Sequence, residues 1–101
     1  MIIVPQEVEK VMRKKGYEQK VIDYINKLLS KKSNLKNVND IRIYVDDYIP
    51  LRLHKIFRNL GKKGLIVTEA HVFEGYLILI CIKKSAKELS LVPDAEPTYR
   101  G

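Results

Sequence analysis

The chain has 101 residues, of which 46% are hydrophobic, enough to build the core of one domain but not of two. Its formal net charge is +7 and its pI is about 9.5, which favours polyanionic partners such as nucleic acid or an anionic membrane surface. Cys81 is the only cysteine, so no intrachain disulfide can form. No apolar run approaches the roughly 20 residues of a membrane span. We therefore expect a cytoplasmic protein that does not enter a membrane.

The positive charge is concentrated in the first two thirds of the chain. Residues 1–68 hold 15 Lys and Arg against 7 Asp and Glu, whereas residues 69–101 hold 4 against 5. Residues 48–68 contain no acidic residue, and their basic residues are Arg52, Lys55, Arg58, Lys62 and Lys63. This window is the main electrostatic feature that a function has to explain.

Two helices are predicted near the N-terminus. Pro5 suits the first turn of a helix over residues 6–15, and Gly16 can end that helix in a left-handed conformation. Residues 18–32 place their apolar side chains on one stripe at helical spacing, which predicts a second helix. That stripe consists of Val21, Ile22, Ile25, Leu28 and Leu29. The polar stretch over residues 33–37 then interrupts the pattern.

Residues 41–48 fit two templates. Ile41, Ile43 and Val45 alternate as in a strand. Ile41, Tyr44, Val45 and Tyr48 recur as in a helix. β-Branched and aromatic residues favour the strand, whereas the spacing to the next element favours the helix.

A third helix and a hairpin are predicted next. Pro50 can begin a helix over residues 50–63, whose core-facing stripe consists of Leu53, Ile56, Phe57 and Leu60. Residues 65–73 and 76–83 are predicted strands joined by Glu74-Gly75, where glycine supplies the positive φ of a tight turn. Residues 85–92 can add a short helical turn, which completes a single domain over residues 1–92. Residues 93–101 are polar with two prolines, and we expect a flexible tail.

The predicted helix over residues 50–63 carries long hydrogen-bond donors opposite its apolar stripe. Such donors can bind phosphate or the edges of purines. Any surface helix has a solvated charged face, but that face usually mixes both signs, because i,i+4 ion pairs stabilise the helix. The residues expected to contact nucleic acid are Arg52, Lys55, Arg58, Asn59, Lys62 and Lys63.

The run LHKIFRNLGKKGLI over residues 53–66, with the apolar positions between Leu35 and Ile49, forms a distinctive hydrophobic skeleton. Over residues 18–83 this skeleton resembles the winged helix-turn-helix family. The resemblance implies an α+β fold with a first helix over 18–32 and a supporting helix over 40–48. It also implies a recognition helix over 50–63 in the major groove of DNA and a wing over 65–83.

A second architecture follows if residues 41–45 form a strand. The chain then contains a strand–helix–strand–strand unit, with the N-terminal helices added to the same layer. This two-layer β-α-β-β sheet resembles Alba-type chromatin proteins and sulfur-carrier proteins. The Cys-Pro-x-Pro motif of the sulfur carriers is absent from the sequence, so sulfur transfer is not indicated. The Alba-like interpretation keeps nucleic-acid binding by the same basic residues.

The predicted strand over residues 76–82 is apolar at every position, so both of its faces require cover. One face can pack on the helices. The other is covered either by a second copy of the chain or by a helix of the same chain. A homodimer is therefore one expected assembly.

Nothing in the sequence indicates a catalytic site. His54, His71 and Cys81 lack metal-ligand spacing. The adjacent Asp46 and Asp47 suit a helix N-cap better than acid–base chemistry. We therefore expect no enzyme, metal, cofactor or small-molecule ligand, but a regulatory or architectural protein that binds double-stranded DNA, for example in transcription regulation. The alternative is a protein-interaction module, such as an antitoxin or inhibitor docking an acidic partner, because residues 3–17 resemble small archaeal antitoxins.

Overall fold

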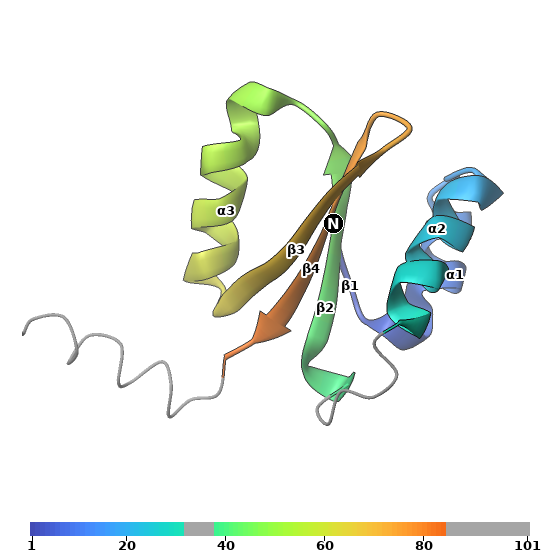
Figure 1. The fold of residues 1–101 in the computed structure, drawn as a ribbon, viewed down its shortest axis with the longest axis horizontal. Coiled ribbons are helices and arrows are strands. Elements are labelled where there is room, and N and C mark those ends of the chain that lie inside the picture. Colours follow the sequence, from blue (N-terminus) through green and yellow to red (C-terminus); the bar gives the residue numbers. More distant parts are fainter. Residues whose placement is uncertain (32–37, 85–101) are drawn as a thin grey trace, which may run out of the picture.

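A computed structural model describes residues 1–31 and 38–84 and has an α+β fold (Figure 1). Short 3-10 helices at Pro5–Glu7, Val38–Asp40 and Pro50–Arg52 accompany the longer elements. These are β1 (Ile2–Ile3), α1 (Val8–Lys14), α2 (Gln19–Ser30), β2 (Ile41–Asp47), α3 (Leu53–Lys62), β3 (Leu65–Phe73) and β4 (Tyr76–Lys83). The strands form one sheet in the order β1-β2-β4-β3, and every neighbouring pair is antiparallel.

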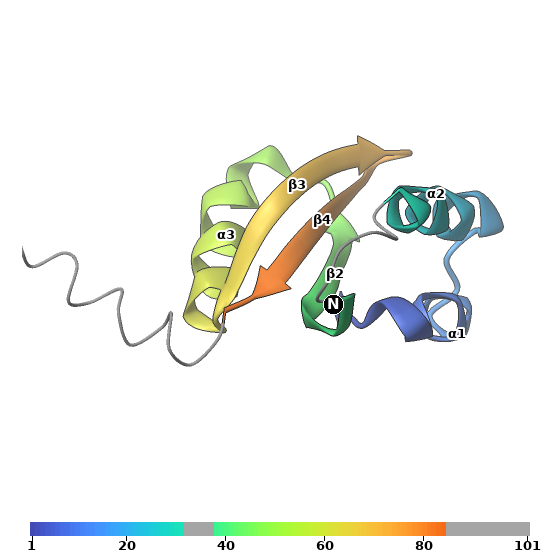
Figure 2. The same cartoon turned by 60° about the horizontal axis from the view of Figure 1, so that its bottom comes forward.

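Helices cover both faces of this sheet, so the described residues form three layers (Figures 1 and 2). α1 and α2 lie on one face, where Ile43 of β2 and Ile78 of β4 join the apolar side chains of both helices. We call this cluster the α1/α2 core. On the other face, Leu60 of α3 packs with Leu77 of β4 in a smaller cluster, the α3 core. The prediction that all helices share one layer is therefore wrong.

Residues 41–47 form a central strand and not a helix. The side chains of Ile41, Ile43 and Val45 are at most 2% exposed and lie in the α1/α2 core, whereas Tyr44 packs on the α3 core. In a helix, Ile43 would lie about 200° around the axis from both Ile41 and Val45, so the three side chains could not share one core. The supporting helix expected over residues 40–48, on which the winged helix-turn-helix arrangement depends, is therefore wrong. The strand–helix–strand–strand alternative describes residues 41–83.

The connection through α3 explains the order of the strands. β2 and β3 each run antiparallel to β4, so they are parallel to each other although β4 separates them. β2, α3 and β3 thus form a split β-α-β unit, into which the hairpin inserts β4. This arrangement holds α3 over the face of β3 and β4.

β4 is covered on both faces by helices of its own chain. Ile78 and Ile80 belong to the α1/α2 core, while Leu77, Leu79 and Cys81 belong to the α3 core. The apolar pattern of β4 is thus accounted for without a second copy of the chain. Burial raises the pKa of the Cys81 thiol to about 11, so at neutral pH the thiol stays protonated and behaves as a small apolar residue.

The local predictions for the first two helices and the hairpin are confirmed. Gly16 ends the α1 segment with a φ of 86°. Glu74 and Gly75 join β3 to β4 with φ values of 51° and 81°. Positive φ at both central residues is the geometry whose twist matches that of the flanking strands.

β1 is an element that the sequence pattern does not predict, because two residues carry no periodicity. Ile2 and Ile3 pair with Tyr44 and Ile43 at the free edge of β2. The polar break over residues 33–37, the helical turn over 85–92 and the tail over 93–101 lie outside the described residues.

Candidate nucleic-acid interface

α3 is held on the sheet by a narrow apolar stripe. Leu60 is 2% exposed, and the partly buried Leu53 and Ile56 pack beside it on the α3 core. Phe57, predicted to share this stripe, is 43% exposed, so that prediction is wrong. At about 100° per residue, Phe57 lies roughly 65° from the centre of the stripe, and a helix resting on two strands does not bury so wide an arc.

The six residues predicted to contact nucleic acid are all exposed. Lys55, Arg58 and Lys62 follow one another at i, i+3 and i+7, so they form one line along the side of α3 that faces away from the sheet. We call these three residues the basic line. Asn59 lies beside it, and Lys63 caps the C-terminal end of α3.

Within residues 1–31 and 38–84, no acidic side chain forms an ion pair with the cations of α3. Nε2 of His54 lies 2.7 Å from Nη2 of Arg58, one turn away on the same helix. In the tautomer that accepts this hydrogen bond, His54 orients the guanidinium while the remaining N–H groups of Arg58 stay available to a ligand.

Arg52 differs from the basic line because an acidic residue lies near it. Asp46 at the end of β2 accepts a hydrogen bond of 2.8 Å from the Tyr44 hydroxyl and one of 2.8 Å from the Asp47 amide. These hydrogen bonds, with smaller contributions from the charge of the Met1 amino group and then from that of Arg52, lower the pKa of the Asp46 carboxyl. The negative charge of Asp46 therefore offsets part of the positive charge of Arg52. The N-cap role predicted for Asp46 and Asp47 is wrong, because no side chain caps the 3-10 helix Pro50–Arg52 or the N-terminus of α3.

The substitution Tyr44→Phe should raise the pKa of Asp46 towards the ordinary aspartate value of 3.8, because it removes the hydrogen bond that lowers that pKa most. In the native protein the ionised carboxylate contributes stability above pH 3.8, and this contribution is lost as the pH falls through the lowered pKa. The variant should therefore lose less stability on acidification. A pH titration of the Asp46 carboxyl carbon by NMR measures the change, and an unchanged midpoint would contradict it.

Leu51 is a surface residue that sequence reasoning missed. It lies directly before Arg52 and is 96% exposed, the highest exposure among the large apolar residues described. The sequence contains a sign of this exposure. Leu51 lies four residues before Lys55, and at this helical spacing it falls on the side of the basic line and not on the side of the core-facing stripe. An apolar side chain therefore lies at the start of the charged surface, and Phe57 lies at its flank.

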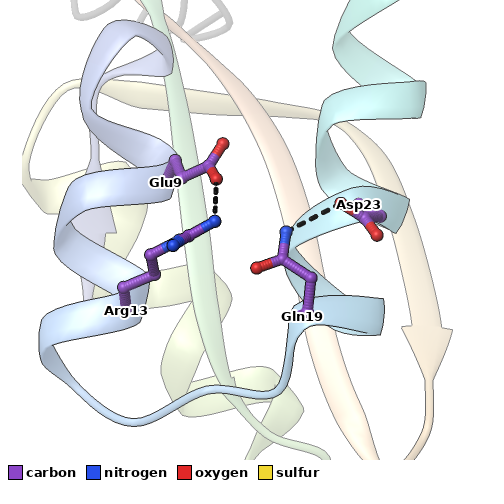
Figure 3. A network of polar contacts seen from close by, with 4 residues as sticks. All are labelled: Glu9, Arg13, Gln19 and Asp23. Atoms are coloured by element: carbon purple, nitrogen blue, oxygen red, sulfur yellow. Dashed lines mark hydrogen bonds and ion pairs between the residues drawn. The ribbon is translucent and has the colours of Figure 1, made fainter.

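The opposite face of the molecule has a surface of mixed sign. On α1, Arg13 forms an i,i+4 ion pair with Glu9, and on α2, Gln19 donates a hydrogen bond of 2.9 Å to Asp23 (Figure 3). Figure 3 shows these two pairs beside each other on the neighbouring helices. This is the pattern expected of an ordinary solvated helix pair, and it contrasts with the single sign of α3.

Elsewhere in the described residues we considered clefts, metal-ligand clusters and membrane-spanning helices as alternative functional features. A shallow cleft of about 240 Å³ is lined by Lys15, Gly16, Tyr17, Asp47 and Tyr76. Its two tyrosine rings are in contact, with centroids 5.0 Å apart. Among the described residues, no three His, Cys, Asp or Glu side chains gather closely enough to hold a metal ion. Within the same ranges, no helix has the length and apolar character needed to cross a membrane.

Comparison of the chain with models of known protein families, with curated proteins and with solved structures found no match. The candidate interface is a helix held by three apolar residues that presents an exposed line of cations, none of which forms an ion pair with another described residue.

Proposed function

We propose that this protein binds double-stranded nucleic acid, with DNA as the main candidate, through the basic line of α3. The observation that carries the proposal is that Lys55, Arg58 and Lys62 are exposed on one side of a single helix and have no acidic partner among the described residues. An unpaired line of cations gains most from a polyanion, because binding releases the counterions of the phosphates.

The dimensions of the basic line fit a phosphate backbone. Lys55 and Lys62 are seven residues apart, so they span about 10 Å at 1.5 Å per helical residue. Successive phosphates of one DNA strand rise by about 3.4 Å along the helix axis and also turn around it, so about two or three of them lie within this span. Lysine and arginine at i, i+3 and i+7 can therefore each reach a separate phosphate.

Entry of α3 into a groove is supported by its position on the outside of the sheet. A helix with its side chains is about 10–12 Å wide, and the major groove of B-DNA is about 12 Å wide. Asn59 lies beside the basic line, and asparagine and arginine can bind adenine and guanine edges respectively. The frame that presents α3 is a split β-α-β unit and not a pair of helices. Binding of this kind suits a regulatory or architectural protein of the cytoplasm, and it uses no catalytic group.

One observation favours a second function. Leu51 is 96% exposed and Phe57 is 43% exposed, and both lie at the border of the basic surface. Apolar anchors beside arginine are typical of protein–protein interfaces. An interaction module that docks an acidic protein partner, such as an antitoxin or inhibitor, is therefore the alternative use of the same surface.

The proposal is tested by measuring the anisotropy of fluorescent duplexes of increasing length while the purified protein is titrated at several salt concentrations. We expect the logarithm of affinity to fall linearly with the logarithm of salt, with a slope of about −0.9 for each phosphate contacted. Affinity should also rise with duplex length, because a longer duplex offers more overlapping sites. No binding to DNA or RNA duplexes at about 50 mM salt would overturn the proposal and favour the interaction module.

A further inference from the structure

β3 forms one edge of the sheet along its full length. Within the described residues its only strand neighbour is β4, so the backbone groups on its outer side have no strand partner there. Natural edge strands usually avoid pairing with other chains by carrying charged residues, especially lysine, or proline, by a bulge, or by being very short. β3 has two of these features, the acid Glu69 and a bulge beside it. β3 runs for nine residues and contains neither lysine nor proline.

A bulge limits the part of this edge that can pair regularly. The register of β3 against β4 shifts between Val67 and Glu69, and Thr68 there donates a side-chain hydrogen bond of 3.0 Å to the Ile80 carbonyl. Beyond the bulge, residues 69–73 pair with β4 without interruption. This five-residue segment is the regular part of the edge.

The segment also exposes apolar side chains on the α3 face. Ala70 and Val72 lie opposite Leu79 and Leu77 of β4, both of which belong to the α3 core, so they face the same side of the sheet. Ala70 is exposed, and Val72 is 52% exposed. Unlike the residues at the centre of the sheet, they are not covered by α3.

We infer that two copies of this protein pair antiparallel through residues 69–73 of β3, with the twofold axis passing near His71. In this register Ala70 of each copy lies opposite Val72 of the other copy. The interface therefore contains two symmetry-related pairs of a small and a larger apolar side chain. The occupant is a second copy because a twofold axis near His71 pairs the same backbone groups of both copies and brings the apolar Ala70 and Val72 of the two copies together. The interface is isologous and closes after two copies.

The pairing has a consequence for α3. A twofold axis perpendicular to the sheet joins the two sheets into one of eight strands and keeps both α3 helices on the same face. The two basic lines then form one surface on the side opposite α1 and α2. The pairing itself is independent of nucleic acid, whereas this joint surface rests on the proposed function.

The test compares A70K/V72K, A70E/V72E and a control, Q6K/N26K, that adds two lysines at exposed positions outside the sheet. Sedimentation velocity of the full chain from micromolar to millimolar concentration should show a monomer–dimer equilibrium for the native protein and the control. Each edge variant should remain monomeric, because like charges would lie directly opposite one another. An equimolar mixture of the two edge variants should recover the dimer.

Circular dichroism of each variant checks that it is folded. A native protein that is monomeric at every concentration, a lysine variant that still dimerises, or a mixture that stays monomeric would overturn the pairing. Hydrogen exchange of the native protein provides a second measurement, because the amides of residues 69–73 should gain protection as concentration rises. Duplex binding is measured separately: monomeric variants that retain it would separate the proposed function from the pairing. A dimer that binds no duplex would refute only the function.

Discussion

Replacing Lys55, Arg58 and Lys62 together with alanine is expected to flatten the salt dependence of duplex binding by about 2.7 in the log–log slope, because three phosphate contacts are lost. Between about 50 and 200 mM salt, the native protein should therefore lose about fortyfold more affinity than the variant. The fold should persist, because all three side chains are exposed and none forms an ion pair among the described residues. Fluorescence anisotropy over a salt series measures both slopes.

A matched control removes the same charge from the opposite face. Lys10, Lys14 and Lys27 are exposed on α1 and α2, and their replacement with alanine lowers the net charge by the same three units. If only the long-range field of the protein mattered, the two triple variants would behave alike. A control that flattens the slope as much as the α3 variant does would contradict an interface on α3.

The substitution Ile78→Ala is expected to lower the free energy of unfolding by about 2–5 kcal/mol, a large part of the total stability of a domain of this size. Ile78 is fully buried in the α1/α2 core, and loss of its side chain leaves a cavity that rigid neighbours fill only in part. Leu79→Ala should cost a similar amount through the α3 core. Urea unfolding followed by circular dichroism measures both.

The control for these variants lies on the same strand. Ile82 is 36% exposed, so Ile82→Ala should cost less than about 1 kcal/mol. We expect a single unfolding transition for every variant, because β4 contributes to both cores and neither can unfold without it. Two separate transitions, or equal costs at Ile78 and Ile82, would contradict the role assigned to β4.

Much of the local structure could be predicted from the sequence. The apolar stripe from Val21 to Leu29 predicts α2, and the change of period after Gly64 predicts both strands of the hairpin and its turn. Such segments are predictable because a single regular pattern runs through each one. The exposure of the predicted contact residues also follows from their spacing on one helix.

The remainder depends on contacts between distant residues. Residues 41–47 satisfy both periods, and only burial of Ile43 between α1, α2 and β4 selects the strand. The placement of helices on both faces of the sheet could not be predicted. The continuous apolar run of β4 shows that both of its faces are covered, but it does not show which helix covers which face. The exposure of Phe57 depends likewise on the width of the surface beneath α3, which no local pattern encodes.

The position of β4 between β2 and β3 also constrains how the chain folds during synthesis. β4 follows both neighbours in the sequence, so neither can pair with it until residues 76–83 have left the ribosome. Until then, both cores lack the strand that they share, and the pairings that remain join residues far apart in the chain. The basic window over residues 48–68 thus emerges before a folded sheet exists to hold it, close to ribosomal RNA, which is itself a polyanion.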